Sequence, residues 1–116
     1  MHSMFALSKF NGDISEWDVS KVYDMKYMFA SSLFDHDISH WNVSNVTDMD
    51  YMFFKTQFNN DISKWNVSGV TDMRMMFAES KFNKDISGWD VKNVQNYFNI
   101  FFNCPIRNIY KPMKFR

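Results

Sequence analysis

The sequence predicts an α/β repeat solenoid built of four similar rungs. All the tryptophans lie at one constant 24-residue interval, and an Asp-Ile-Ser triplet ends two residues before each of them. Valine, methionine and phenylalanine recur in fixed registers between them. A period of this length is typical of stacked units that bury their apolar faces against one another. The tryptophans are Trp17, Trp41, Trp65 and Trp89.

Each rung is predicted to contain a short parallel strand at its tryptophan. In the third copy, Trp65 and Val67 alternate around Asn66, which is the spacing of a strand with one buried face. Paired strands would place successive tryptophans roughly 4.8 Å apart. We therefore expect the indole rings to form one continuous apolar column, with Trp65 among the most costly positions to truncate.

A short helix is predicted to follow each strand. Val70, Met73 and Phe77 are three and four residues apart, as on one face of a helix. Thr71 or Asp72 would cap its first turn. These offsets resemble a leucine-rich-repeat rung in which tryptophan and valine replace leucine. A loop then leads to the next copy, and its Asp, Asn and Ser side chains are expected to hydrogen-bond the loop backbone.

Residues 1–116 are predicted to form a single domain. The first rung has little sequence before Phe5 to cover it, so this edge is expected to be exposed, or covered by another subunit or a further segment. Self-association through this uncapped rung is one possibility. The predicted repeats and the C-terminal cap are, in order, roughly 4–27, 28–51, 52–75, 76–99 and 100–116.

Composition excludes several classes of protein. Hydrophobic residues make up 46% of the chain, which argues against disorder. The 13 basic and 13 acidic side chains balance, so no net field favours nucleic acid. Cys104 is the only cysteine, which excludes an internal disulfide. The chain contains no run of about 18 apolar residues, so no membrane span is predicted. No secretory signal or membrane anchor is recognisable.

Two patterns resemble catalytic or metal sites when taken in isolation. His36 and His40 flank an Asp-Ile-Ser triplet, but their equivalents in the other copies include Gly12, Asn60 and Lys64, so we interpret both as variable surface residues. A column of aspartates is interpreted as loop caps rather than paired catalytic carboxylates. We therefore predict no catalytic residue, no metal site and no cofactor. The aspartates of this column are Asp13, Asp37, Asp61 and Asp85.

The string at residues 58–73, closed by Met76 and Phe77, resembles the BspA-like surface-protein repeat, also known as a domain of unknown function common in mycoplasma lipoproteins. The resemblance extends from Met4 to about Phe102. It implies a leucine-rich-repeat-like solenoid and, for the better-known members, protein binding or adhesion. It implies no enzymatic activity. Such repeats occur in bacterial surface proteins, protists and large DNA viruses, which suggests a cell surface or a viral particle as the location.

A binding surface is expected from two kinds of outward-facing residue. The first kind varies between copies, and the second stands between the buried tryptophan and valine of each copy. This mixed, mildly polar face suits a protein or glycan partner. The leading prediction is a non-enzymatic protein-binding or adhesion module. The alternative is a structural minor component of a larger assembly, such as a viral particle or surface layer. A hydrolase or metal enzyme, motivated only by the histidines and the aspartate column, comes third. The predicted surface residues are Glu16, Asp18, His40, Asn42, Lys64, Asn66 and Asp90.

Overall fold

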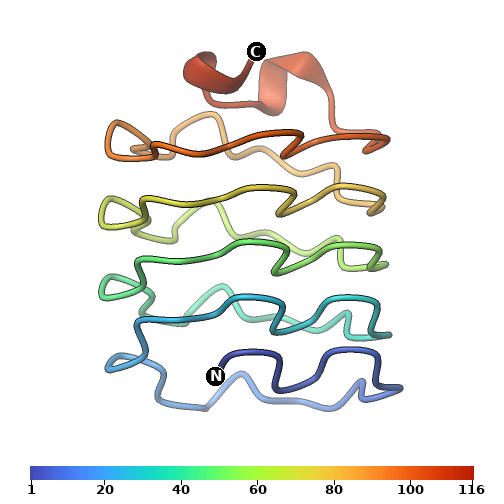
Figure 1. The fold of residues 1–116 in the computed structure, drawn as a ribbon. Helices are drawn as coiled ribbons and strands as arrows, with labels where there is room; N and C mark the ends of the chain where they lie inside the picture. Colours follow the sequence, from blue (N-terminus) through green and yellow to red (C-terminus); the bar gives the residue numbers. More distant parts are fainter.

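A computed structural model describes residues 1–116. The chain winds into a stack of flattened coils, and residues 24 positions apart lie above one another (Figure 1). The only helical elements are two short 3-10 helices near the C-terminus, η1 (Asn108–Tyr110) and η2 (Met113–Phe115). Isolated parallel bridges link Asp24 to Asp48, Asp48 to Asp72, and Asp72 to Asn96. None of the helices has the length and apolar character needed to cross a membrane.

The predicted α/β leucine-rich-repeat-like solenoid is therefore wrong. The chain contains no α-helix and no β-sheet, and its backbone consists of turns joined by extended stretches. Most backbone hydrogen bonds either close a turn of four residues or link a residue to the neighbouring coil. The 24-residue period of the sequence is the period at which these inter-coil bonds recur.

One long side of each coil, which we call the paired segment, forms the inter-coil bonds. In residues 25–31, alternate N–H groups donate to the next coil, as from Met25 to the Asp48 oxygen at 3.0 Å and from Phe29 to the Met52 oxygen at 3.0 Å. The intervening N–H groups, such as that of Met28, close turns within the coil. The other paired segments comprise residues 1–7, 49–55, 73–79 and 97–103.

Left-handed residues explain why the paired segment is not a helix. Tyr27 and Ser31 have φ angles of 60° and 54°, and each later paired segment repeats such a pair four residues apart. A positive φ suits the third position of a type II turn and interrupts a right-handed helix. The spacing of Val70, Met73 and Phe77 thus has another cause, since overlapping turns also bring these side chains to one side, where all are buried.

The opposite long side, which we call the Trp segment, is not a strand. The N–H of Trp41 donates to the Ile38 oxygen at 3.1 Å, and the N–H of Val46 donates to the Val43 oxygen at 3.0 Å, so two tight turns replace the ladder. The indole Nε1–H of Trp41 instead donates to the Ile14 oxygen of the preceding coil at 3.1 Å. Trp65 and Trp89 repeat this bond to the carbonyls 27 residues earlier. The four Trp segments comprise residues 13–22, 37–46, 61–70 and 85–94.

Columns of stacked aromatic rings fill the space between the two sides. Phe29, Phe53 and Phe77 are fully buried, and their successive centroids lie 5.6 Å apart in near-parallel orientation. The rings of Trp65 and Trp89 also stack, with centroids 6.5 Å apart rather than the roughly 4.8 Å expected for paired strands, because no strands pair beside them. The phenylalanine columns, rather than the indole rings, therefore form the centre of the core.

The two ends of the stack differ. Residues 104–116, which include η1 and η2, lie over the last coil (Figure 1). The buried Phe115 packs against Tyr97 with a centroid distance of 4.7 Å, and the Lys114 Nζ donates to the oxygens of Val91 and Val94. At the other end, nothing in the structure covers the first coil, and Trp17 is 37% exposed while Trp65 is 4% exposed.

Candidate functional site

All the predicted surface residues are exposed and lie on the Trp segments. They belong to two columns. Glu16, His40 and Lys64 occupy the variable column, which Gly88 completes in the fourth copy. The second column lies two residues further along the chain and is more uniform in chemistry. It contains Asp18, Asn42, Asn66 and Asp90.

The uniform column stabilises the turns of the Trp segment. The Asn42 Oδ1 accepts hydrogen bonds from the backbone N–H of Ser44 at 3.1 Å and from its hydroxyl at 2.6 Å. Asp18 and Asn66 make the same two bonds to the serines that follow them, and Asp90 accepts one from the N–H of Lys92. The Oδ1 atoms of this column are therefore occupied within the chain.

The variable column is free of such bonds, and two of its members line a polar hollow. His40 and Lys64 lie on adjacent coils at the rim of a depression of about 330 Å³. Its remaining lining comes from Asp37, Asp61 and two neutral polar residues, so positive and negative groups face the same space. The sequence placed His40 and Lys64 on one surface but did not indicate the hollow between them.

Asp37 and Asp61 line the same hollow, and the whole aspartate column acts as loop caps, which confirms the sequence interpretation. The Asp37 Oδ1 accepts the N–H of Ser39 at 2.8 Å, and the other three aspartates make the same bond. Hydrogen bonds from the N–H and hydroxyl of Ser39 hold the pKa of Asp37 below its ordinary value. The pKa of Asp61 is lowered in the same way by Ser63.

The two histidines that resembled a metal site have separate environments. His36 is half-buried, and its Nε2 lies 2.8 Å from the carbonyl oxygen of Asn11 in the preceding coil. His40 is exposed at the polar hollow. A neighbouring column of Asn and Asp side chains also joins the coils. The Asn59 Oδ1, for example, accepts the N–H of Asn83 at 2.8 Å.

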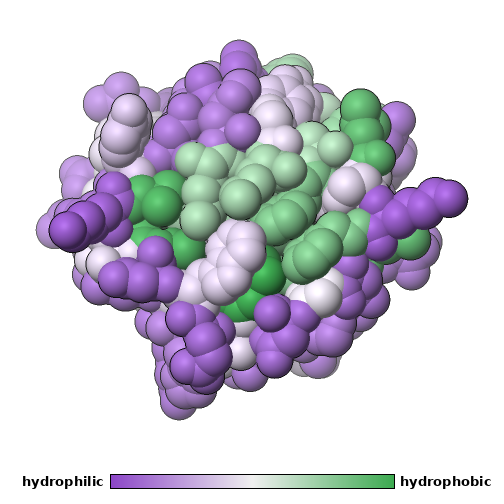
Figure 2. Space-filling model, turned by 90° about the horizontal axis from the view of Figure 1, so that it is seen from below, coloured by the Kyte–Doolittle hydropathy of each residue, from purple (hydrophilic) through white to green (hydrophobic).

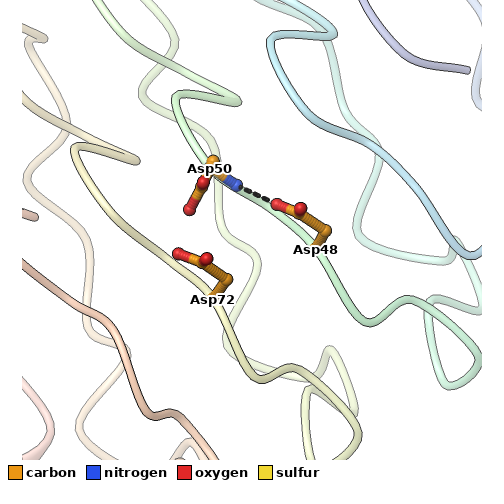
Figure 3. A group of neighbouring side chains, drawn as sticks. All are labelled: Asp48, Asp50 and Asp72. Carbon is orange, nitrogen blue, oxygen red and sulfur yellow. Dashed lines mark hydrogen bonds between the residues drawn. The ribbon is translucent and has the colours of Figure 1, made fainter.

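A cluster of three aspartates was not predicted. Asp48, Asp50 and Asp72 offer carboxylate oxygens that all lie within 4.8 Å of one another (Figure 3). Asp50 is only 2% exposed, and its N–H donates to the Asp48 Oδ1 at 3.0 Å. Arg74 approaches Asp50 from the next coil, with its N–H 2.9 Å from Oδ1 and its Nη2 3.1 Å from Oδ2.

Burial and like charges perturb this cluster. Desolvation, together with the neighbouring carboxyls of Asp72 and Asp48, raises the pKa of Asp50 to about 7. Both carboxyl oxygens of Asp50 are bonded to Arg74, and Lys26 lies 3.5 Å from Asp48. These partners account for the cluster as an ion-pair network between coils. The sequence signal for this network is the alternating charge of Lys26, Asp50 and Arg74, which occupy equivalent positions in successive coils. Their register lies between two registers of buried methionines.

Cys104 is half-buried beside the last coil. Its Sγ donates to the carbonyl oxygen of Phe82 at 3.2 Å and lies 3.7 Å from the hydroxyl of Ser80. Burial raises the pKa of this thiol above its ordinary value, so the protonated and less nucleophilic form is favoured at neutral pH.

The stacked coils, the turn-capping columns and one variable exposed column define a repeat protein with a 24-residue structural unit. The chain belongs to the family described as Mycoplasma protein of unknown function, DUF285, whose model matches residues 1–110. No curated protein and no solved structure matches the chain. The family match includes all four tryptophan-centred copies and the first residues of the tail.

Proposed function

We propose that this chain is a non-enzymatic protein-binding module that uses the outer face of its Trp segments. The observation that carries the proposal is the contrast between neighbouring columns on this face. Asp18, Asn42 and Asn66 repeat one turn-stabilising bond in successive coils. Glu16, His40 and Lys64 occupy equivalent exposed positions, yet they differ in charge and make no hydrogen bond within the chain.

The surrounding structure would hold such a surface in place before a partner arrives. Two tight turns and two side-chain caps fix the backbone on either side of His40. The adjacent indole of Trp41 is buried and bonded to the preceding coil. Binding to a preorganised surface costs less conformational entropy than binding to a flexible loop, which supports recognition by this face.

The chemistry of the polar hollow favours a protein partner of mixed charge. Lys64 and His40 offer donors, while Asp37 and Asp61 offer carboxylates within the same depression. A surface of alternating sign favours a complementary protein patch over a uniformly charged polymer. The resemblance to BspA-like repeats, whose better-known members act in protein binding or adhesion, also supports the proposal.

A pair of charge reversals tests it. Lys64→Glu places on this face the residue that the first copy carries at Glu16, while Lys55→Glu makes the same change on the paired segment, where the fourth copy carries Glu79. Each variant should therefore keep the fold, as circular dichroism would verify. The wild-type chain is crosslinked in a native extract, and the recovered partner is purified for binding measurements.

We expect Lys64→Glu to weaken partner binding about tenfold and Lys55→Glu to leave it unchanged. Equal affinities for all three proteins would contradict the assignment of this face. Recovery of no partner by the wild-type chain would contradict the function itself. The alternative, a structural component of a larger assembly, is favoured by a separate observation, which is the apolar character of the two ends of the stack.

A further inference from the structure

The large apolar side chains that remain exposed gather at the two ends of the stack. All of them belong either to residues 4–33 or to residues 97–113, and none lies in the intervening coils. Figure 2 shows the first-coil end, where an apolar centre is surrounded by hydrophilic side chains. Apolar patches with a polar rim are typical of association surfaces. The exposed residues at these ends are Met4, Leu7, Trp17, Tyr23, Tyr27, Tyr97, Phe98, Phe102, Ile109 and Met113, whereas the exposed Leu33 lies on the flank of the second coil.

The hydrogen-bonding groups at the first-coil end are acceptors. Within the stack, each paired segment donates its N–H groups to the next coil and accepts from the preceding one. The N–H groups of Ser3, Phe5 and Leu7 follow this pattern and bond the second coil. The intervening carbonyl oxygens of residues 2, 4 and 6 point the other way and have no donor in the chain.

The hydrogen-bonding groups at the opposite end are donors. The carbonyl oxygens of residues 96, 98, 100 and 102 accept bonds from the coil below. The N–H groups of Tyr97, Asn99, Phe101 and Asn103 have no acceptor in the chain. Tyr97, Asn99 and Phe101 also line a groove of about 520 Å³, to which Lys111 and Phe115 of the tail contribute.

The two ends also carry opposite charge. Residues 1–24 contain four acidic side chains and two lysines, which gives a net side-chain charge of −2. Residues 97–116 contain four basic side chains and no acidic one, which gives +4. Residues 25–96 contain seven basic and nine acidic side chains, so the excess of positive charge is confined to the C-terminal end of the stack. Opposite ends of two copies therefore attract, while like ends repel.

The geometry points to head-to-tail association of this chain, with residues 1–7 of one copy lying along the groove at residues 97–103 of another. In this register the N–H groups of Asn99, Phe101 and Asn103 donate to the carbonyl oxygens of residues 2, 4 and 6 of the second copy. The same offset joins Met75, Phe77 and Glu79 to residues 98, 100 and 102 within the chain.

Pairing two first-coil ends would be less favourable, although it would cover the same apolar centre. It would place carbonyl oxygens against carbonyl oxygens and bring two surfaces of charge −2 together. Head-to-tail contact is heterologous, so each added copy presents a fresh end and growth continues beyond the dimer. The outer face of the Trp segments stays free, so this inference is independent of the proposed partner-binding face.

Sedimentation velocity on the 116-residue chain tests the inference. Met4→Lys adds positive charge to the end that meets the basic tail, and Met113→Asp adds negative charge to the end that meets the acidic first coil. Both residues are more than half exposed. The matched controls are Leu33→Lys and Leu33→Asp, which change a half-exposed leucine on the flank at a position where other coils carry Gln57 and Lys81. Circular dichroism verifies that each variant is folded.

We expect the wild-type chain and both controls to form a concentration-dependent series of oligomers that weakens with added salt. Met4→Lys and Met113→Asp should each remain monomeric when alone. Their equimolar mixture should form a dimer and nothing larger, because only one intact pair of ends is present. A wild-type chain that stays monomeric up to about 1 mM would overturn the inference. So would a Met113→Asp variant that self-associates like wild type while Met4→Lys does not, since this result indicates symmetric pairing.

Discussion

Truncating a tryptophan in the middle of the stack should cost far more than truncating one at its open end. Trp65 is 4% exposed, packs near Phe53 and Trp89, and donates its Nε1–H to the Ile38 oxygen at 3.0 Å. Trp17 is 37% exposed, has Phe5 as its one aromatic neighbour, and makes no indole hydrogen bond. The pair thus differs in burial and in hydrogen bonding while the residue type is the same.

The magnitudes follow from these contacts. A buried tryptophan removes about 150–250 Å² from water, and its truncation to alanine costs about 3–5 kcal/mol once the cavity is included. The Ile38 carbonyl loses its donor as well, so we expect about 5 kcal/mol for Trp65→Ala. Trp17→Ala leaves no enclosed cavity at an open end, and about 2 kcal/mol is expected. Trp65→Phe keeps a ring but loses the donor, and should cost about 1–3 kcal/mol.

Urea unfolding followed by far-ultraviolet circular dichroism measures these differences without depending on tryptophan fluorescence. Equal m-values for the variants would show that the midpoints report stability rather than a change in the unfolded state. A Trp17→Ala variant that is as destabilised as Trp65→Ala would refute the reasoning, because it would mean that neither stacking nor the indole bond distinguishes the two sites. A neutral Trp65→Phe substitution would remove the hydrogen bond from the explanation.

Two further predictions concern ionisation and backbone strain. The raised pKa of Asp50 means that the folded state retains a proton which the unfolded state releases near pH 3.8. Its contribution to stability is complete below that pH and is lost as pH rises through about 7, so Asp50→Asn should gain melting temperature relative to wild type as pH rises from about 4 to about 7. A constant difference would contradict this. Glu79 has a φ of 60°, so Glu79→Gly should stabilise by about 0.5–1 kcal/mol in urea unfolding, while Ala78→Gly should destabilise.

The sequence was sufficient to predict which apolar side chains of the inner copies are buried, because their burial depends on register. Val67, Met73 and Phe77 occupy registers that recur in successive copies, and all are buried. It was not sufficient to predict the backbone that buries them. Spacings of three and four residues fit a helix and also fit overlapping turns. The turns form here because Tyr51 and Lys55 adopt left-handed φ angles, which the sequence does not indicate, since neither position is a glycine.

The candidate site could be predicted only in part, for a related reason. His40 and Lys64 could be predicted as surface residues, because a comparison of the copies shows which positions vary and which are outward-facing. The polar hollow between them depends on how far one coil stands from the next, and the Asp50–Arg74 pair depends on contacts between residues 24 positions apart. The repeated apolar residues do not indicate this pair, because its signal is the alternating charge of Lys26, Asp50 and Arg74.

Contacts in this molecule reach one period and seldom further, since hydrogen bonds join residues up to 27 positions apart along the chain. Excising one full period from the middle would bring each donor opposite an acceptor equivalent to the one it lost. Inserting one period would do the same. Length can therefore change in whole periods during evolution or engineering without a new core, whereas a deletion that is not a multiple of 24 residues would shift every column out of alignment.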